Sequence, residues 1–346
     1  MKRMVLTALV AATLVACDSA DNQLEKQSES TVADTATPGE QVPATKVVSA
    51  PAKLADYTMA AEKVADGVYA IITPARDFPN PQNKGWNSNS TFVVTGDGVL
   101  VVDTGSSATI GTALLNTIRT VTDKPIRWIV NTHGHGDHWL GGTSIASAQT
   151  EVITSTKVKE RIKNELGYWV DLFNQMSEGA IGNDSKALIP TTTVDERTTR
   201  KMGGVEVTLI PSGDSHSPGD LLVWLPKLKV LIGGDVLYTD RAPGTFEGKI
   251  GQWIKLLKEL ETLDVVKMIP GHGAVGDGQD IINERKYFEI IWNAVAKAVE
   301  AGQSDFEVLP VIKEQLIAYE KIYPGLEKQI GRTVSHAYAQ AEAAAF

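Results

Sequence analysis

Three histidines and one aspartate stand within six residues near the middle of the chain, in the run His133-Gly134-His135-Gly136-Asp137-His138. The run follows an apolar stretch that predicts a buried strand. Side chains two positions apart on an extended segment point the same way, so His133 and His135 can bind one metal ion. The glycine before Asp137 eases a turn, after which Asp137 and His138 can face a second ion. Imidazole and carboxylate groups are ligands for Zn²⁺ or Fe²⁺, so the spacing predicts a metal site.

Other candidate ligands stand where further apolar stretches end. His216 lies in the polar loop 212–220, Asp235 follows an apolar run that ends in two glycines, and His272 is flanked by two glycines. Five of the chain's six histidines therefore lie in turns rich in Gly or Pro, just beyond apolar runs. A rigid sheet would present such residues to one cleft, so we expect these candidates to share one site.

The elements that must position these residues alternate between strand and helix. Short runs rich in apolar and β-branched residues predict strands, and longer stretches with apolar residues at helical spacing predict helices. The strands are expected at residues 63–65, 68–73, 91–95, 99–102, 126–130, 151–155, 205–210, 220–224, 229–232 and 265–269. The helices are expected at about residues 107–120, 156–175, 247–263, 279–301 and 305–320. Strands flanked by helices along the whole body predict a layered α/β architecture rather than an all-β barrel.

The ordered set of candidate ligands resembles that of the metallo-β-lactamase superfamily. All seven ligand positions are filled within about residues 62–276, by His133, His135, Asp137, His138, His216, Asp235 and His272. The resemblance implies a four-layer αββα sandwich over residues 57–276, with the site at one edge of its two sheets. Apolar residues at helical spacing in the tail predict that residues 277–346 form a helical C-terminal extension packed on the sandwich.

The resemblance also implies how two zinc ions per chain would be held, with iron as the alternative metal. One ion would be bound by His133, His135 and His216 and the other by Asp137, His138 and His272, with Asp235 bridging the two. Asp103 matches the family's Asp-x-Gly element. We expect Asp103 to orient a ligand rather than to bind metal itself.

The resemblance implies a metal-dependent hydrolase in which a metal-bridging hydroxide attacks a carbonyl-type bond (thioester, ester, lactone or amide) of a small molecule. Asp137 and Asp235 are the expected catalytic residues, and Asp137 can take or pass on a proton while it remains a ligand. Lactamases of the first two subclasses carry a cysteine where this chain has Asp235, whereas glyoxalase II-like thioesterases and lactonases carry an aspartate. Residues 234–243, Trp253 and the helical tail look most like exported quinoprotein relay system zinc metallohydrolases.

Two other activities stay open at this point. One is a β-lactamase of the class B type, weak or promiscuous towards β-lactams. The other is a mononuclear iron persulfide dioxygenase, whose family keeps nearly the same ligand set but uses three of the ligands. A metal-binding lipoprotein without activity is a third reading, and the full set of catalytic ligands argues against it.

Substrate contacts are expected from aromatic and charged residues beside these motifs. Trp86 lies in a polar loop, residues 74–89, where relatives carry a mobile flap. Trp139 directly follows the first motif, and Tyr238 and Arg241 follow the bridging aspartate. The expected partner is a small-molecule substrate.

The N-terminus predicts export and lipid attachment. A positive segment and an apolar stretch precede Leu14-Val15-Ala16-Cys17, which resembles the bacterial lipobox and contains the chain's single cysteine. We expect a lipoprotein signal peptide at residues 1–16, a lipid on Cys17 and a disordered tether through residue 56, because residues 17–56 are rich in Ser, Thr, Ala and Gln. The chain is then expected in the bacterial cell envelope, facing the periplasm, and Asp18 favours the inner membrane.

Composition excludes several other classes of protein. The 346 residues are 42% hydrophobic and 22% charged, which is ordinary for a globular protein, and 33 Lys and Arg against 42 Asp and Glu give a net charge of −9. Such an acidic chain offers no basic surface for the backbone of a nucleic acid, so no nucleic-acid partner is expected. Contact with a membrane is expected only through the N-terminal lipid, and the oligomeric state stays open.

Overall fold

The computed structural model describes residues 50–345, which belong to one compact unit. The expected signal peptide at residues 1–16, the lipid attachment site Cys17 and the tether up to residue 49 lie outside the described residues. Residues 50–56, which composition assigns to the tether, contact the body: Ala52 N donates a hydrogen bond to Ala180 O at 2.7 Å. Among the described residues, no helix has both the length and the apolar character needed to cross a membrane.

The first sheet has seven strands in the order β1-β2-β3-β4-β5-β6-β7. They are β1 Glu62–Ala65, β2 Val68–Ile71, β3 Ser90–Val94, β4 Val99–Val102, β5 Ile126–Val130, β6 Glu151–Thr154 and β7 Thr192–Thr193. Strands β1 to β4 pair antiparallel, whereas β4 to β7 pair parallel. Parallel pairing brings the carboxyl ends of β4 and β5 to the same edge, so the segments that follow them lie side by side.

The second sheet has five strands in the order β12-β11-β10-β9-β8. They are β8 Thr198–Met202, β9 Val205–Gly213, β10 Asp220–Leu225, β11 Val230–Tyr238 and β12 Lys267–His272. The antiparallel meander from β8 to β11 ends in the parallel pair of β11 and β12. The carboxyl ends of this last pair therefore also share one edge.

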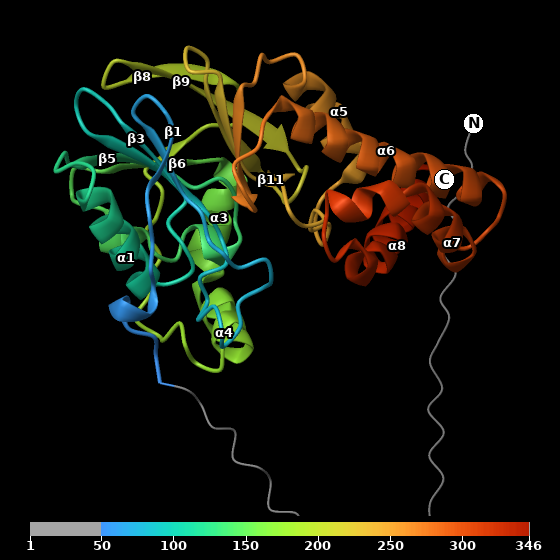
Figure 1. Cartoon of the computed structure of the whole chain (residues 1–346), viewed down its shortest axis with the longest axis horizontal. Helices are drawn as coiled ribbons and strands as arrows, with labels where there is room; N and C mark the ends of the chain where they lie inside the picture. The colour runs from blue at the N-terminus through green and yellow to red at the C-terminus, as the bar shows by residue number, and fades with distance from the viewer. Residues whose placement is uncertain (1–49, 346) are drawn as a thin grey trace, which may run out of the picture. The chain divides into compact units, whose positions relative to one another are not determined.

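Helices cover the outer faces of both sheets. They are α1 Ala108–Arg119, α2 Gly142–Ile145, α3 Thr156–Asn164, α4 Leu166–Met176, α5 Ile250–Leu260, α6 Gly278–Glu300, α7 Asp305–Gln315 and α8 Leu326–Ala345, with 3-10 turns η1 Leu54–Asp56, η2 Gly136–His138 and η3 Ile317–Lys321. Figure 1 shows α1 against the first sheet and α5 and α6 beside the second. The four-layer αββα arrangement with added C-terminal helices confirms the fold class expected from the sequence.

Strand β4 shows how an uninterrupted apolar sequence produces these layers. Side chains alternate between the two faces of a strand, and β4 is buried on both. Leu100 and Val102 pack between the sheets with Val223 of β10, whereas Val99 and Val101 pack outward with residues of α1. A single run of four apolar residues thus contributes to two cores.

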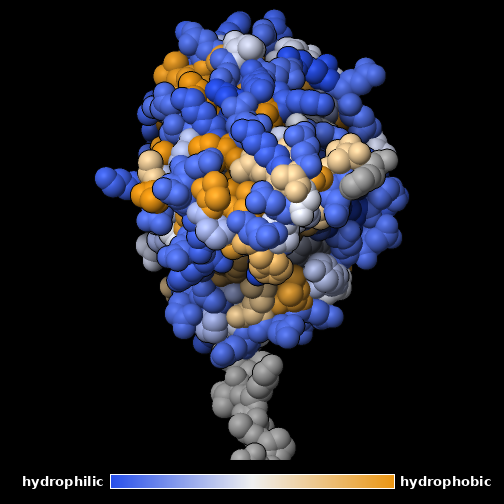
Figure 2. Space-filling view, turned by 90° about the vertical axis from the view of Figure 1, so that its right-hand side faces the viewer, coloured by the Kyte–Doolittle hydropathy of each residue, from blue (hydrophilic) through white to orange (hydrophobic). Residues whose placement is uncertain are grey.

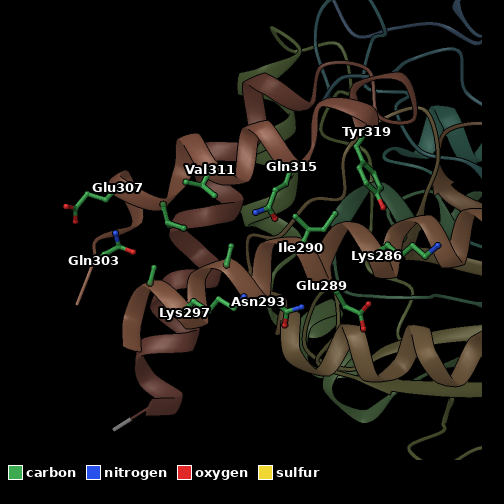
Figure 3. A pocket seen from close by; sticks show the side chains of 13 residues that line it. Lys286, Glu289, Ile290, Asn293, Lys297, Gln303, Glu307, Val311, Gln315 and Tyr319 are labelled. Carbon is green, nitrogen blue, oxygen red and sulfur yellow. The ribbon is translucent and has the colours of Figure 1, made fainter. Parts of the chain in front are cut away.

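The C-terminal helices share a core with the second sheet. Trp253 of α5, Phe288 of α6, Ile312 of α7 and Val334 of α8 belong to the same buried cluster as Leu231 of β11. Figure 2 shows a mostly hydrophilic face with small hydrophobic areas, which is ordinary for a protein surface. A hollow of about 600 Å³ lies between α6 and α7 (Figure 3), and none of the seven candidate ligands lines it.

Two strands run further than their apolar patterns predict. The patterns predict ends at residues 232 and 269, whereas β11 continues to Tyr238 and β12 to His272. Asp235 and His272 therefore lie within strands rather than in turns beyond them. Strand β8 is not predicted at all, because its polar residues show no alternation and it forms by pairing with β9.

The helix expected at 156–175 is divided in two at Glu165, whose backbone leaves the helical conformation. The division gives α4 its own direction. Trp169 and Phe173 of α4 can then lie directly over the backbone of Gly136, where a Cβ atom would come within 2.6 Å of Trp169 Cβ. Helix α4 thus covers the predicted metal-binding run.

A buried carboxyl group where α6 contacts β11 should make the stability of the fold depend on pH. Glu284 is fully buried, its Oε2 accepts a hydrogen bond from Tyr238 N at 2.9 Å, and its Oε1 has no hydrogen-bond partner among the described residues. Burial raises the pKa of Glu284 well above its ordinary value of 4.5. The folded chain thus keeps a proton that the unfolded chain releases, so this contribution to stability is complete below pH 4.5 and is lost as pH rises through the folded-state pKa.

We expect Glu284→Gln to remove this dependence, because an amide keeps a hydrogen-bond acceptor and cannot ionise. Relative to this variant, the wild-type free energy of unfolding should fall by about 1.4 kcal/mol per pH unit between the two pKa values. Urea unfolding of both proteins from pH 5 to pH 8 measures this difference in the free energy of unfolding. The control is Glu300→Gln at the exposed end of α6. Parallel pH profiles for wild type and Glu284→Gln would contradict the prediction.

Candidate metal centre

The seven candidate ligands come from both sheets and meet at one edge. The segment after β5 carries four of them, in part on the turn η2, and the loop between β9 and β10 carries His216. Asp235 lies in β11 and His272 ends β12. Gly271 makes this approach feasible, because a Cβ atom there would lie 2.0 Å from Asp235 Oδ1.

The first group of ligands comprises His133, His135, His216 and Asp235, whose ligand atoms all lie within 4.8 Å of one another. His216 Nε2 lies 3.1 Å from His135 Nδ1 and 3.6 Å from Asp235 Oδ2. Two ligands of a tetrahedral zinc ion lie about 3.3 Å apart when each bond is about 2.0–2.1 Å. The spacing of these atoms is therefore that of a metal-binding group.

The second group comprises Asp137, His138 and His272, again within 4.8 Å. The Nε2 atoms of His138 and His272 each lie 3.6 Å from Asp137 Oδ2. Asp235 lies against this group too, with Oδ1 3.2 Å from His138 Nε2 and Oδ2 3.1 Å from His272 Nε2. One carboxylate therefore borders both groups, as a bridging ligand must.

The donor atoms at the centre of the cluster fit a metal ion. His133 Nε2, His138 Nε2 and Asp235 Oδ1 are buried and have no hydrogen-bond partner among the described residues. Buried polar atoms without a partner are rare because each loses its hydration without compensation. Three such atoms facing one another are accounted for when they bind cations, and imidazole with carboxylate is a donor set that zinc accepts.

Neighbouring groups orient four of the five imidazoles. The Nδ1 atoms bond to Thr132 Oγ1 (His133, 3.0 Å), Asp103 Oδ2 (His138, 2.8 Å), Gly244 O (His216, 3.1 Å) and Asn87 O (His272, 2.7 Å). Carbonyl and carboxylate oxygens can only accept, and the Thr132 hydroxyl donates its own proton to Asp103, so each neutral imidazole carries its proton on Nδ1 and turns the lone pair of Nε2 towards the cluster. His135 is reversed: its Nδ1 faces the cluster and its Nε2 lies 3.7 Å from Glu247 Oε1.

Asp103 takes the orienting position that the sequence suggests. It follows β4 with a φ of 59°, an unusual conformation for a residue other than glycine. Its Oδ1 accepts from Thr132 N at 2.8 Å, and its Oδ2 accepts from Thr132 Oγ1 at 2.7 Å as well as from His138 Nδ1. The strained backbone is thus held by contacts that also fix a ligand.

Burial and mutual charge set the protonation of the cluster. Burial lowers the pKa of His133 far below its usual range and that of His216 to about 3, so both are neutral as ligands must be. Burial would also lower the pKa of His138, but the carboxylates of Asp137, Asp235 and Asp103 outweigh it and raise that pKa well above 6.5. The carboxylates thus keep His138 protonated in the absence of metal, and a metal ion can replace that positive charge.

The cluster opens into a cavity of about 360 Å³ whose walls are mostly apolar. The walls comprise Phe78, Pro79, Tyr168, Trp169, Leu172, Phe173, Met176 and Phe246. Five of these residues come from α4. Phe78, Tyr168 and Phe246 are exposed by 42%, 60% and 45%, so aromatic rings surround the entrance.

Two of the four expected substrate contacts line this cavity and two do not. Tyr238 and Arg241 do, and Tyr238 OH also donates to Asp235 Oδ2 at 2.8 Å. Trp139 is buried and donates a hydrogen bond from Nε1 to Gly134 O at 3.0 Å. It therefore fixes the backbone of the metal-binding run rather than contacting the cavity. Trp86 is buried with the residues that pack around α1.

Sequence reasoning missed several residues of the site. Asn87 donates from Nδ2 to Asp137 Oδ2 at 2.8 Å, and Asp220 accepts bonds from the backbone N atoms of His216 and Ser217, which shapes the loop that carries His216. In the sequence, Asn87 begins a polar run and Asp220 ends the loop 212–220. These two features were the only local indications that the residues belong to the site. The aromatic residues of α4 lie within an expected helix, and nothing local in the sequence marks them as cavity walls.

Comparisons with known proteins agree with this geometry. The model of the metallo-beta-lactamase superfamily matches residues 83–272. The metallo-beta-lactamase type 2 of Bacillus sp. (strain 170) is 23% identical over 197 residues, which cover 55% of this chain and 68% of that protein. The linear primary-alkylsulfatase of Pseudomonas sp. (strain ATCC 19151) is 23% identical over 285 residues, 70% of this chain and 53% of that protein.

Solved structures show the same fold. A metallo-beta-lactamase from Pontibacter korlensis matches with a TM-score of 0.52 and 22% identity, over 67% of this chain and 99% of that one. A stereoselective inverting sec-alkylsulfatase from Pseudomonas sp. matches with a TM-score of 0.61 and 16% identity, over 82% of this chain and 50% of that one. This chain thus spans about half the length of the alkylsulfatases. Because the family model covers more than half of the chain and includes all seven clustered ligands, the chain belongs to the metallo-beta-lactamase superfamily.

Proposed function

We propose that this protein is a hydrolase that holds two zinc ions and cleaves a carbonyl-type bond, a thioester, ester, lactone or amide, in a small molecule. The observation that carries the proposal is the pair of ligand groups that share Asp235, with unpartnered donor atoms at their centre and a cavity beside them. Zinc ions bound in such a site supply a hydroxide near neutral pH and polarise the carbonyl oxygen under attack.

The chain's own residues divide the remaining tasks. Asp137 lines the cavity and is oriented by Asn87, so its carboxylate can accept the proton released during attack and pass it to the leaving group. Tyr238 fixes the bridging carboxylate of Asp235 through its hydroxyl. The aromatic walls exclude water, which strengthens every electrostatic interaction within the cavity.

Sulfate esters are a second candidate substrate class. The alkylsulfatase match covers 70% of this chain, against 55% for the lactamase match, and the apolar walls suit an alkyl group. The β-lactamase alternative belongs to the same hydrolytic chemistry, and the persulfide dioxygenase alternative requires a single iron ion. The lipobox-like sequence ending at Cys17 supports a place in the bacterial cell envelope, facing the periplasm.

Metal content separates the hydrolase from the dioxygenase. We expect about two zinc atoms per chain in full-length protein purified without added metal, measured by inductively coupled plasma mass spectrometry. Chelation should abolish hydrolysis of a panel of thioesters, lactones, β-lactams and sulfate esters, and zinc should restore it. One iron atom per chain together with oxygen uptake on a persulfide substrate would contradict the zinc hydrolase.

Asp137→Asn tests the catalytic carboxylate. An amide of the same shape cannot accept a proton and is a poorer ligand, so kcat/KM on the best substrate of the panel should fall by at least about 10²- to 10⁴-fold. The circular dichroism spectrum should stay unchanged. Asp171→Asn, on the exposed side of α4, is the matched control. Retained activity in Asp137→Asn would exclude this role.

Asp103→Asn tests the orientation of His138. Asparagine tolerates the positive φ at this position, so the fold should persist while the charge that fixes the imidazole is lost. We expect zinc affinity to weaken by about 10- to 100-fold in competition with a chromogenic chelator. Asp97→Asn, in the exposed turn after β3, is the control. Equal affinities in the two variants would contradict the prediction.

A further inference from the structure

One cationic side chain on the cavity wall forms no ion pair with any residue that the structure describes. Arg241 is only 4% exposed, and its Nε and Nη1 atoms are buried without a hydrogen-bond partner among the described residues. A guanidinium carries five N–H donors and stays charged, so burying it without acceptors costs free energy. Burial of this kind is compensated when a ligand brings the acceptors.

The neighbouring acids are committed elsewhere. Asp240 accepts bonds at its Oδ2 from Arg76 Nη2 and from Ala274 N, both at 3.2 Å. Glu247, which also lines the cavity, is paired with both terminal nitrogens of Arg161. Arg161 is thus a satisfied structural arginine, whereas Arg241 is not.

Aromatic rings hold the Arg241 guanidinium in place instead. Its Cζ lies 5.5 Å from the ring centre of Phe78 and 5.8 Å from that of Tyr238. Stacking on aromatic faces orients the guanidinium plane but uses none of its hydrogen-bond donors. The Tyr238 hydroxyl in turn donates a hydrogen bond to Asp235, so a single side chain, that of Tyr238, links Arg241 to the candidate metal ligands.

We propose that Arg241 binds a singly charged oxyanion of the substrate, a carboxylate, sulfonate or sulfate group, next to the bond that is cleaved. Its planar fork can give two parallel N–H···O bonds to such a group. Arg241 is the one lysine or arginine that lines the cavity in the described part of the chain, which favours a monoanion over a phosphate dianion. The apolar walls, with Phe78, Trp169 and Phe246, accept the adjoining hydrocarbon. The position beside the reacting bond rests on the proposed hydrolase function, whereas anion binding does not.

Non-hydrolysable ligands test the site without relying on turnover. Isothermal titration calorimetry of the zinc-loaded full-length protein compares octanoate and octanesulfonate with neutral octanamide. We expect the wild type to bind the anions about 10- to 100-fold more tightly than the amide. In Arg241→Gln this ratio should approach one. In Arg332→Gln it should persist, because Arg332 is exposed and lies over Phe246 outside the cavity wall.

An anion preference that persists in Arg241→Gln would assign the preference to the metal ions and overturn the inference, as would equal binding of all ligands by the wild type. Should Arg241→Gln not fold, Arg241→Lys keeps the charge and loses the fork, and the anion affinity should fall several-fold; an unchanged affinity overturns the inference.

If the protein hydrolyses nothing in the panel yet keeps an Arg241-dependent preference for anions, the proposed function fails and the anion site stands. If it hydrolyses neutral esters without that preference, the site fails and the function stands.

Discussion

Two carboxylates and five imidazoles share one small, water-poor volume at the edge of the two sheets, and the need to balance their charge governs the surrounding structure. A buried carboxylate is tolerated only beside positive charge. Without metal, histidine protons supply it, which is why the pKa of His138 rises and that of Asp235 falls well below its usual range despite burial. With metal bound, the same groups become ligands. The cluster is thus built for cations, and its neighbours serve to keep each donor atom aimed at the centre.

The fold meets this requirement through two parallel strand pairs. β4 with β5, and β11 with β12, each deliver chain segments to a common edge, and the two sheets pack face to face so that these edges coincide. The backbone can approach closely there because Gly271 leaves room for Asp235. Helix α4 and the segment after β11 then close the sides with aromatic residues. The sheets position the ligands, and the connecting segments shape what can reach them.

Features that depend on local sequence could be predicted, whereas features that depend on tertiary contacts could not. Metal ligands are dense along the chain and follow apolar strands, so spacing and a family resemblance sufficed to single out seven residues that the structure brings together. Asn87 and Glu247 meet those ligands from segments about 50 to 110 residues away, and no local pattern shows which ligand either of them contacts. Trp86 and Trp139 illustrate the converse, because their places in the expected flap and beside the first motif suggested substrate contact, whereas the structure buries both side chains in hydrophobic clusters. Strand β8 was missed since its pairing with β9, rather than its own composition, makes it a strand.

The loop between β2 and β3 is fastened most densely in its C-terminal half, where Lys84 O accepts a hydrogen bond from Tyr57 OH and Gly85 O accepts one from Ser106 Oγ. Asn87 bonds to Asp137 and accepts from His272, and Asn89 donates from Nδ2 to Pro270 O and Gly273 O, both at 2.9 Å, and accepts from Thr73 N. The tip with Phe78 is held by the half-exposed ion pair of Arg76 and Asp240 and by contacts of the Phe78 ring with Phe246 and the Arg241 guanidinium. Swinging the tip would widen the entrance while the coordination geometry stays still, so access and reactivity can change independently in evolution.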